Sequence, residues 1–375
     1  MQKRSMLFCL IGVILFVLCG CTNYQKPMET GEVVSETVSN VFTFPDQNMQ
    51  ITDATEPSSQ MTIEQWQSVS MGSKSLTLGF CDYTPKNDIT YYTYSGGEAS
   101  VNITMTAEGM EKVGVGIFLF LDGQIQPYRT EEETEYSYMH TFYPENSKEY
   151  IIPLYLIPVT GESGEILEMQ VMSVIWPDYF LDKGRTSIQH TSGTTGSATT
   201  LIFEDTPPAM EMPEVRERLL SCKLSYVELL SSEIAGWTAE DMRNKYEYHY
   251  YFDGIEDGAS IFDYGASDTA IFRYEIWGNT AGKFGFVIFV DNQPVTIEPE
   301  KLISIETQNG MKTVIEAQLD MSDFDGSSVV YAVLIARNYF ADGVGNGAYE
   351  IFRETIWPYY LSDSKDFYDL MGWVK

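Results

Sequence analysis

The sequence predicts an all-β protein made of two tandem antiparallel β-sandwich domains that arose by internal duplication. Two repeated stretches carry this prediction. The stretch VGVGIFLFLDGQ at Val113–Gln124 recurs as GKFGFVIFVDNQ at Gly282–Gln293, at a shift of 169 residues. The stretch Ile175-Trp176-Pro177 recurs as Ile356-Trp357-Pro358, at a shift of 181 residues. The 12-residue difference between the shifts predicts an additional loop or turn in the second copy.

The first repeated stretch predicts a central strand followed by a tight hairpin turn. Residues 113–121 are apolar or small on both faces of an extended chain, which is typical of a strand covered on both sides. Asp122-Gly123 and Asp291-Asn292 then supply residues that tolerate positive φ, as two-residue hairpins require. Because turn chemistry alone explains both aspartates, we expect them to be turn residues and nothing more.

The rest of each copy consists of short strand-like runs separated by turn residues, with no long helical pattern between them. The expected strands are Leu76–Cys81, Ile89–Tyr94, Val101–Ala107, Val113–Leu121, Glu149–Ile157 and Glu168–Ile175, then Lys245–Phe252, Ala270–Trp277, Phe284–Val290, Leu302–Glu306, Lys312–Leu319, Val329–Ala336 and Tyr349–Ile356. This layout resembles immunoglobulin and fibronectin-III domains, although the Cys…Trp…Cys hallmark is absent.

Composition places the domain boundaries. We expect one sandwich at 61–188, a linker rich in Thr, Ser, Gly and Pro at 189–213, and the second sandwich at 214–375. Thr199–Phe203 is left open as a strand that instead closes the first domain. Thr238 to Asp241 resembles a capping box and predicts the start of a short helix, and a second short helix is conceivable around Trp66.

The N-terminal residues read as an export signal. Lys3 and Arg4 precede an apolar run, Met6–Leu18, that is too short for an ordinary spanning helix. The run ends in Leu18-Cys19-Gly20-Cys21, which resembles the lipobox of bacterial lipoproteins. The resemblance implies that residues 1–20 are removed and that Cys21 carries diacylglycerol and a further acyl chain such as palmitate, which together anchor the protein in the cell membrane, facing the extracytoplasmic side. The alternative is an uncleaved anchor helix.

The charge of the mature chain constrains its partners. Residues 21–60 are polar and contain three prolines, which predicts a flexible tether between lipid and body. Cleavage removes two positive charges and no negative ones, leaving 21 Lys and Arg against 54 Asp and Glu, a net charge of −33. Such a surface repels nucleic acid and excludes a polynucleotide partner. It favours solubility and attracts divalent cations or cationic wall components.

Catalytic and metal-binding motifs are absent from the sequence. No HExxH, paired-Cys, Gly-rich phosphate loop or GxSxG motif occurs, so we expect no enzyme activity and no cofactor. A weak candidate for Ca²⁺ is Asp320, Asp323 and Asp325, whose spacing does not match an EF-hand and which a solvated turn explains better. Cys81 and Cys222 remain in the exported body, either as a bridge or, as we favour, as two separate buried thiols.

Tyrosine-rich runs stand ahead of both repeat cores and are the candidate ligand-binding residues. They comprise Tyr91, Tyr92 and Tyr94 in the first copy and Tyr246, Tyr248 and Tyr250 in the second. In an extended strand the last three share one face, with rings about 6–7 Å apart. Such a row is suited to stack on sugar rings. Ordinary packing across a sheet is the favoured explanation, because tyrosine prefers strands regardless of ligand. Trp176 and Trp357 are expected to be core or interdomain residues.

The predicted function is therefore binding or scaffolding by a lipid-anchored envelope protein. Its ligand is a surface glycan or another envelope protein. An exposed apolar patch or an unpaired edge strand would favour the protein ligand over a tyrosine groove for glycan. The alternative is a hydrolase of wall or extracellular polysaccharide, which needs two carboxylates about 5–10 Å apart in a cleft.

Overall fold

The computed structural model describes residues 50–53, 75–81, 91–110, 113–177, 192–215, 218–244, 246–253, 261–263, 268–278, 282–295, 303–322, 328–337 and 359–362. All of them belong to one compact unit of the chain. The predicted signal peptide, Cys21, most of the tether, Trp66, Trp357, Asp323 and Asp325 lie outside the described residues. No helix among the described residues is long and apolar enough to cross a membrane.

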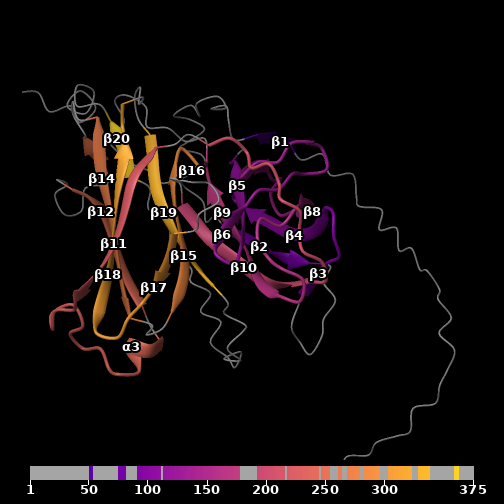
Figure 1. Cartoon of the computed structure of the whole chain (residues 1–375). Helices are drawn as coiled ribbons and strands as arrows, with labels where there is room; N and C mark the ends of the chain where they lie inside the picture. Colours follow the sequence, from indigo (N-terminus) through magenta and orange to yellow (C-terminus); the bar gives the residue numbers. More distant parts are fainter. Residues whose placement is uncertain are drawn as a thin grey trace, which may run out of the picture. The chain divides into compact units, whose positions relative to one another are not determined.

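The first copy is a sandwich of two sheets (Figure 1). The smaller sheet has the order β2-β4-β8, formed by β2 (Ser75–Cys81), β4 (Ala99–Glu108) and β8 (Glu149–Leu156). The larger sheet has the order β1-β7-β5-β9-β10-β3, with β6 paired to β5. Its strands are β1 (Gln50–Asp53), β3 (Tyr91–Tyr94), β5 (Val115–Leu121), β6 (Gln124–Gln126), β7 (Met139–Tyr143), β9 (Ile166–Ile175) and β10 (Ser192–Phe203).

The second copy is also a two-sheet sandwich. A four-stranded sheet has the order β11-β18-β14-β12, formed by β11 (Leu219–Glu228), β12 (Tyr246–Phe252), β14 (Thr269–Gly278) and β18 (Met311–Asp320). The facing sheet has the order β13-β20-β19-β15-β16, with β17 paired to β15. Its strands are β13 (Ile261–Asp263), β15 (Lys283–Val290), β16 (Gln293–Val295), β17 (Ile303–Glu306), β19 (Ser328–Ala336) and β20 (Tyr359–Ser362). The predicted all-β fold of two antiparallel sandwiches is confirmed.

Strand pairing shows the duplication and corrects its second anchor point. Val115 lies opposite Ile175 in the first copy, and the equivalent Phe284 lies opposite Ala336 in the second. The residue that corresponds structurally to Trp176 is therefore Arg337 and not Trp357. The shift at this place is 161 and not 181 residues, so the additional residues expected between the two repeated stretches are not there.

Two predicted boundaries also change. Residues 192–203 fall within the predicted linker but form β10, which pairs antiparallel with β9 and parallel with β3. The strand that was left open at Thr199–Phe203 is thus present and begins earlier. Residues 50–53 fall within the predicted tether but form β1, which pairs with β7. Both strands are polar in composition, and their partners in the sheet, not their own hydrophobicity, place them.

The central strands are covered on both sides, as predicted. Every residue of β5 is buried. In β15, Phe284, Phe286 and Ile288 pack in the core of the second sandwich, whereas the alternate residues Val287 and Phe289 belong to the core of the first. The alternation follows from the two-residue period of a strand. A shared hydrophobic layer therefore joins the two copies.

The predicted turns and the capping box are confirmed. Asp122 and Asp291 have φ of 47° and 50°, and the residues after them, Gly123 and Asn292, have 79° and 62°, which closes the β5–β6 and β15–β16 hairpins. Thr238 Oγ1 accepts from the Asp241 amide at 3.1 Å and donates to the Asp241 carboxylate at 2.7 Å. The helix that this box starts, α3 (Asp241–Asn244), is one turn long.

Candidate functional site

Three of the six candidate tyrosines form a stacked row on β12, an edge strand of the four-stranded sheet. The ring centroids of Tyr246 and Tyr248, and of Tyr248 and Tyr250, are each 6.2 Å apart, in agreement with the expected spacing. Tyr274 of β14 stacks on Tyr248 at 5.7 Å with nearly parallel rings. The row faces the interior, half-buried against the second core, while the alternate residue Glu247 is exposed. These rings therefore take part in packing.

The tyrosines of the first copy do not form a matching row. Tyr94 is fully buried, packs on Phe203 at 5.6 Å and donates from its hydroxyl to the Gly97 carbonyl. Tyr92 donates to the carbonyls of Cys81 and Asn102. Strand pairing shows that β3 corresponds to β13, whereas β12 corresponds to β2. The two tyrosine runs thus occupy different strands of the repeat and do not form equivalent sites.

A pair of carboxylates meets on the outer face of the four-stranded sheet. Lys312 Nζ lies 2.8 Å from Glu233 Oε1 and 2.7 Å from Glu275 Oε2. Burial lowers the pKa of Lys312, but hydrogen bonds to both carboxylates outweigh it and raise the pKa overall. The hydrogen bond from Lys312 lowers the pKa of Glu233. A glycosidase acid needs a carboxyl with a raised pKa, so this pair is suited to hold a lysine and not to protonate a leaving group.

The remaining candidates for chemistry are structural. The part of the chain that the structure describes contains no cluster of metal-ligating side chains. Asp320 accepts hydrogen bonds from Ser322 N and Oγ, which lower its pKa and close a turn. Cys81 and Cys222 are half-buried and are not joined to each other. Burial raises the pKa of Cys222 to about 11, so its thiol is a poor nucleophile at neutral pH.

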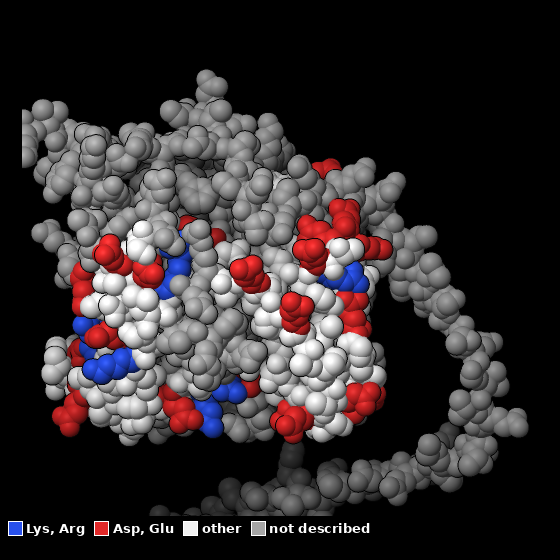
Figure 2. Space-filling model, turned by 45° about the horizontal axis from the view of Figure 1, so that its top comes forward, with Lys and Arg blue, Asp and Glu red and all other residues white. Residues whose placement is uncertain are grey.

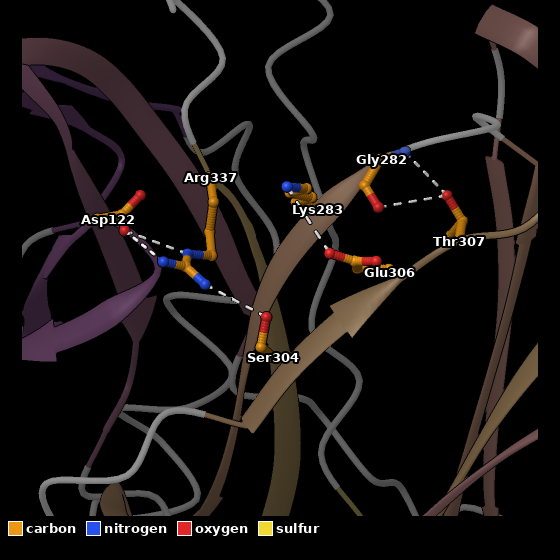
Figure 3. Close-up of polar contacts among 7 residues, drawn as sticks. All are labelled: Asp122, Gly282, Lys283, Ser304, Glu306, Thr307 and Arg337. Carbon is orange, nitrogen blue, oxygen red and sulfur yellow. Dashed lines mark hydrogen bonds and ion pairs between the residues drawn. The ribbon is translucent and has the colours of Figure 1, made fainter.

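The two copies contact each other through the hairpin turns, which corrects the expectation that the aspartates act only as turn residues. Arg337, directly after β19, donates from Nη2 to Asp122 Oδ2 at 2.6 Å and from Nη1 to Ser304 Oγ at 3.2 Å (Figure 3). Asp122 is buried in this contact. Next to the ion pair, Gly123 touches Gly285, where an added Cβ would come within 2.0 Å of the Gly123 carbonyl oxygen.

The hairpin of the second copy makes the reciprocal contact. Asn292 Nδ2 donates to the Pro177 carbonyl at the end of β9, at 2.6 Å, and Asn292 Oδ1 accepts from the Tyr331 hydroxyl. Each hairpin therefore reaches the end of the neighbouring strand in the other copy. The repeat in the sequence indicates that both turns exist, but no sequence signal pairs Asp122 with a residue 215 positions away.

The most exposed long strand is β11, which sequence reasoning missed. Seven large apolar side chains are exposed among the described residues. Five of them lie in β11 or two residues after it: Leu220, Leu224, Tyr226, Val227 and Leu230. This strand is one edge of its sheet, opposite to β12. Its signal in the sequence is the alternation of Cys222, Leu224 and Tyr226 with Lys223 and Ser225, which is the two-residue period of a strand.

The charged surface supports no anion-binding site on the side drawn in Figure 2, where red acidic side chains are scattered and basic ones are few. Several basic side chains are paired. Arg273 contacts both Asp253 and Glu316, and Arg129 contacts Glu98. The contrast with the apolar strand β11 makes that strand the distinctive surface feature among the described residues.

Comparisons with known proteins complete the description. No family model matches the chain, and no curated protein matches it. Solved structures with weak similarity include fibronectin(III)-like modules of Clostridium thermocellum CbhA, with 7% identity over 77% of this chain and 94% of that chain at a TM-score of 0.18. The C-terminal domain of the AgI/II polypeptide BspA of Streptococcus agalactiae has 10% identity over 77% and 100% of the two chains at 0.19. At these scores the fold rests on the chain's own sheets: two antiparallel β-sandwich copies joined by a shared core.

Proposed function

We propose that the protein is a lipid-anchored scaffold on the extracytoplasmic face of the cell membrane, and that it binds another protein through β11. The lipobox-like Leu18–Cys21 supports the anchor. The shared hydrophobic layer and the Asp122–Arg337 ion pair support a body in which both copies move together. The observation that carries the proposal is the apolar edge strand, because such a strand offers both backbone groups and apolar side chains to a second chain.

A protein ligand fits this surface better than a glycan does. The tyrosine row is turned inward and shares ring contacts with Phe272, Tyr274 and Phe284 of the core. The β11 side chains, in contrast, are exposed by about a third to two thirds of their area, from 36% for Tyr226 to 64% for Leu230. Exposed apolar residues that cluster on one strand are typical of protein interaction sites.

A pull-down from envelope material tests the proposal. The bait is the soluble body, residues 22–375, as wild type and with Leu224→Glu or Tyr226→Glu, which place a charge on the open strand. Ile166→Glu is the matched control, because Ile166 is 58% exposed but lies in the first copy. We expect wild type and Ile166→Glu to enrich the same protein and both β11 variants to lose it at least tenfold.

The opposite result has a defined meaning. Glycan enrichment that survives both β11 changes and disappears with Tyr246→Ala and Tyr248→Ala would replace the protein ligand by a carbohydrate. Circular dichroism of each variant shows whether the fold persists, so a loss of binding is not confused with unfolding.

A further inference from the structure

The backbone of β11 has one row of hydrogen-bonding groups paired and the other open. The Leu229 amide donates to the Gly310 carbonyl, and Val227, Ser225 and Lys223 lie opposite Lys312, Val314 and Glu316 of β18. Hydrogen-bonded pairs alternate along an antiparallel ladder. The odd-numbered residues therefore bond to β18, and the N–H and C=O groups of Cys222, Leu224, Tyr226 and Glu228 point toward the open edge. No other described strand pairs with that edge.

The exposed apolar residues are arranged symmetrically about Ser225. Leu224 and Tyr226 flank it at one residue, and Leu220 and Leu230 flank it at five. An antiparallel strand reads in the opposite direction, so a segment that is symmetric about one residue is complementary to a copy of itself. A two-fold axis at Ser225 places Leu224 of one chain opposite Tyr226 of the other, twice. It also places open backbone groups opposite open backbone groups.

We propose that the protein of this ligand site is a second copy of the same chain, which joins β11 to β11 antiparallel about Ser225. The inference rests on the proposed function, whose binding strand it uses. In this register Lys223 lies opposite Val227 and Cys222 opposite Glu228, so no like charges face each other across the strands. A register centred on Lys223 would place two lysines in contact. The pairing merges two four-stranded sheets into one continuous sheet.

Charge adds a condition to this assembly. Each mature body carries a net charge of −33, so two bodies repel each other at low ionic strength. Salt screens this repulsion, since the Debye length falls from about 30 Å at 0.01 M to about 8 Å at 0.15 M. The self-association should therefore strengthen as salt is added, as expected for apolar and backbone contacts between like-charged bodies. Anchoring in one membrane raises the local concentration and favours pairing further.

Cysteine cross-linking tests the register in the full-length chain purified in detergent. The background carries Cys81→Ala and Cys222→Ala, and Ser225→Cys is added to it. On the two-fold axis the two residues 225 form a pair that is not hydrogen-bonded, with Cα atoms about 4.5 Å apart, within the range that a disulfide spans. Lys223→Cys is the matched control on the same face. Its two copies are separated by about 13 Å along the strands, at 3.3 Å for each residue.

Mild oxidation at 0.15 M salt should convert most of the Ser225→Cys protein, and little of the control, into a disulfide dimer. The dimer fraction should fall at least threefold at 0.01 M salt and with Leu224→Glu. Equal cross-linking of both variants, cross-linking at residue 223 only, or no cross-linking at 225 would each overturn the proposal. If Ser225→Cys stays monomeric while the pull-down still enriches another protein through β11, self-pairing is wrong and the scaffold function stands. Cross-linking at 225 without any captured protein supports self-pairing alone.

Discussion

Asp122 and Arg337 form the ion pair that joins the two copies, with Arg337 Nη2 2.6 Å from Asp122 Oδ2 (Figure 3). The two residues come from corresponding ends of the two sheets, a hairpin turn in the first copy and the end of β19 in the second. The Asp122 side chain is 8% exposed, so its charge depends on this partner. A charge that loses its partner in such a place destabilises the fold more than the pair itself stabilises it.

Changing either partner should therefore destabilise the body. Asp122→Asn keeps a residue that tolerates positive φ and removes the charge, and we expect it to lower the free energy of unfolding by about 2 kcal/mol. Arg337→Met should cost a similar amount. Urea unfolding of both single variants and the double variant gives the coupling energy, which we expect to be about 1–2 kcal/mol. A coupling near zero would mean that the ion pair does not join the copies.

Gly285 and Gly116 are equivalent positions of the repeat with different surroundings. An alanine Cβ at 285 would lie 2.0 Å from the Gly123 carbonyl oxygen, which belongs to rigid backbone, whereas at 116 it would meet the flexible Met139 sulfur at 2.5 Å. We expect Gly285→Ala to lower the free energy of unfolding by more than about 4 kcal/mol and Gly116→Ala by about 1–2 kcal/mol. Thermal unfolding of the two variants measures the difference. Equal effects would show that the copies separate easily at Gly123.

Acid should weaken the body partly through Glu98. A hydrogen bond from Arg129 holds the pKa of Glu98 below its ordinary value of 4.5. The unfolded chain then binds the proton more readily, so this contribution to stability is present above pH 4.5 and is lost as the pH falls through the lower folded pKa. The effect should stay below about 1 kcal/mol because the pair is partly exposed.

Chemical unfolding of wild type and Glu98→Gln between pH 3 and 7 measures this contribution. The difference in stability between them should shrink as the solution is acidified, and Arg129→Met should remove most of it. A difference that does not change with pH would refute the assignment.

Lipid attachment has its own test. In a bacterial host fed with labelled palmitate, the wild-type chain should carry label and sediment with membranes. Cys21→Ser should carry no label and should accumulate either as uncleaved precursor or as released protein. Cys81→Ser, a change in the body, is the control that should keep the label. Label that persists in Cys21→Ser would contradict the lipobox interpretation.

The repeated core was predictable because its physics is local. A strand that is apolar on both faces, followed by Asp-Gly or Asp-Asn, determines both the burial of β5 and β15 and the positive φ of their turns. The sequence did not reveal which face the tyrosines of β12 take, because tyrosine is suited to both a core and a surface, and register decides the face. It also misplaced the equivalence of Trp176, because a shared tripeptide is weaker than the ladder that pairs Ala336 with Phe284.

The edge strand β11 escaped prediction for a different reason. It is exposed at most of its positions, so its apolar residues do not form the one-sided pattern that marks a half-buried strand. The long-range pairing of β11 with β18, from Leu219–Leu319 to Glu228–Met311, is what makes it a strand. Such non-local partners cannot be obtained from a single sequence.

Hydrogen exchange resolved to single amides of β11 tests the central claim most directly. In the dilute, monomeric body at low salt, the amides of Lys223, Ser225 and Val227 should be protected by β18, and those of Cys222, Leu224 and Tyr226 should exchange rapidly. At high protein concentration and 0.15 M salt the second set should become protected as well. If Cys222, Leu224 and Tyr226 are already protected in the monomer, the edge is closed and β11 is not a binding strand.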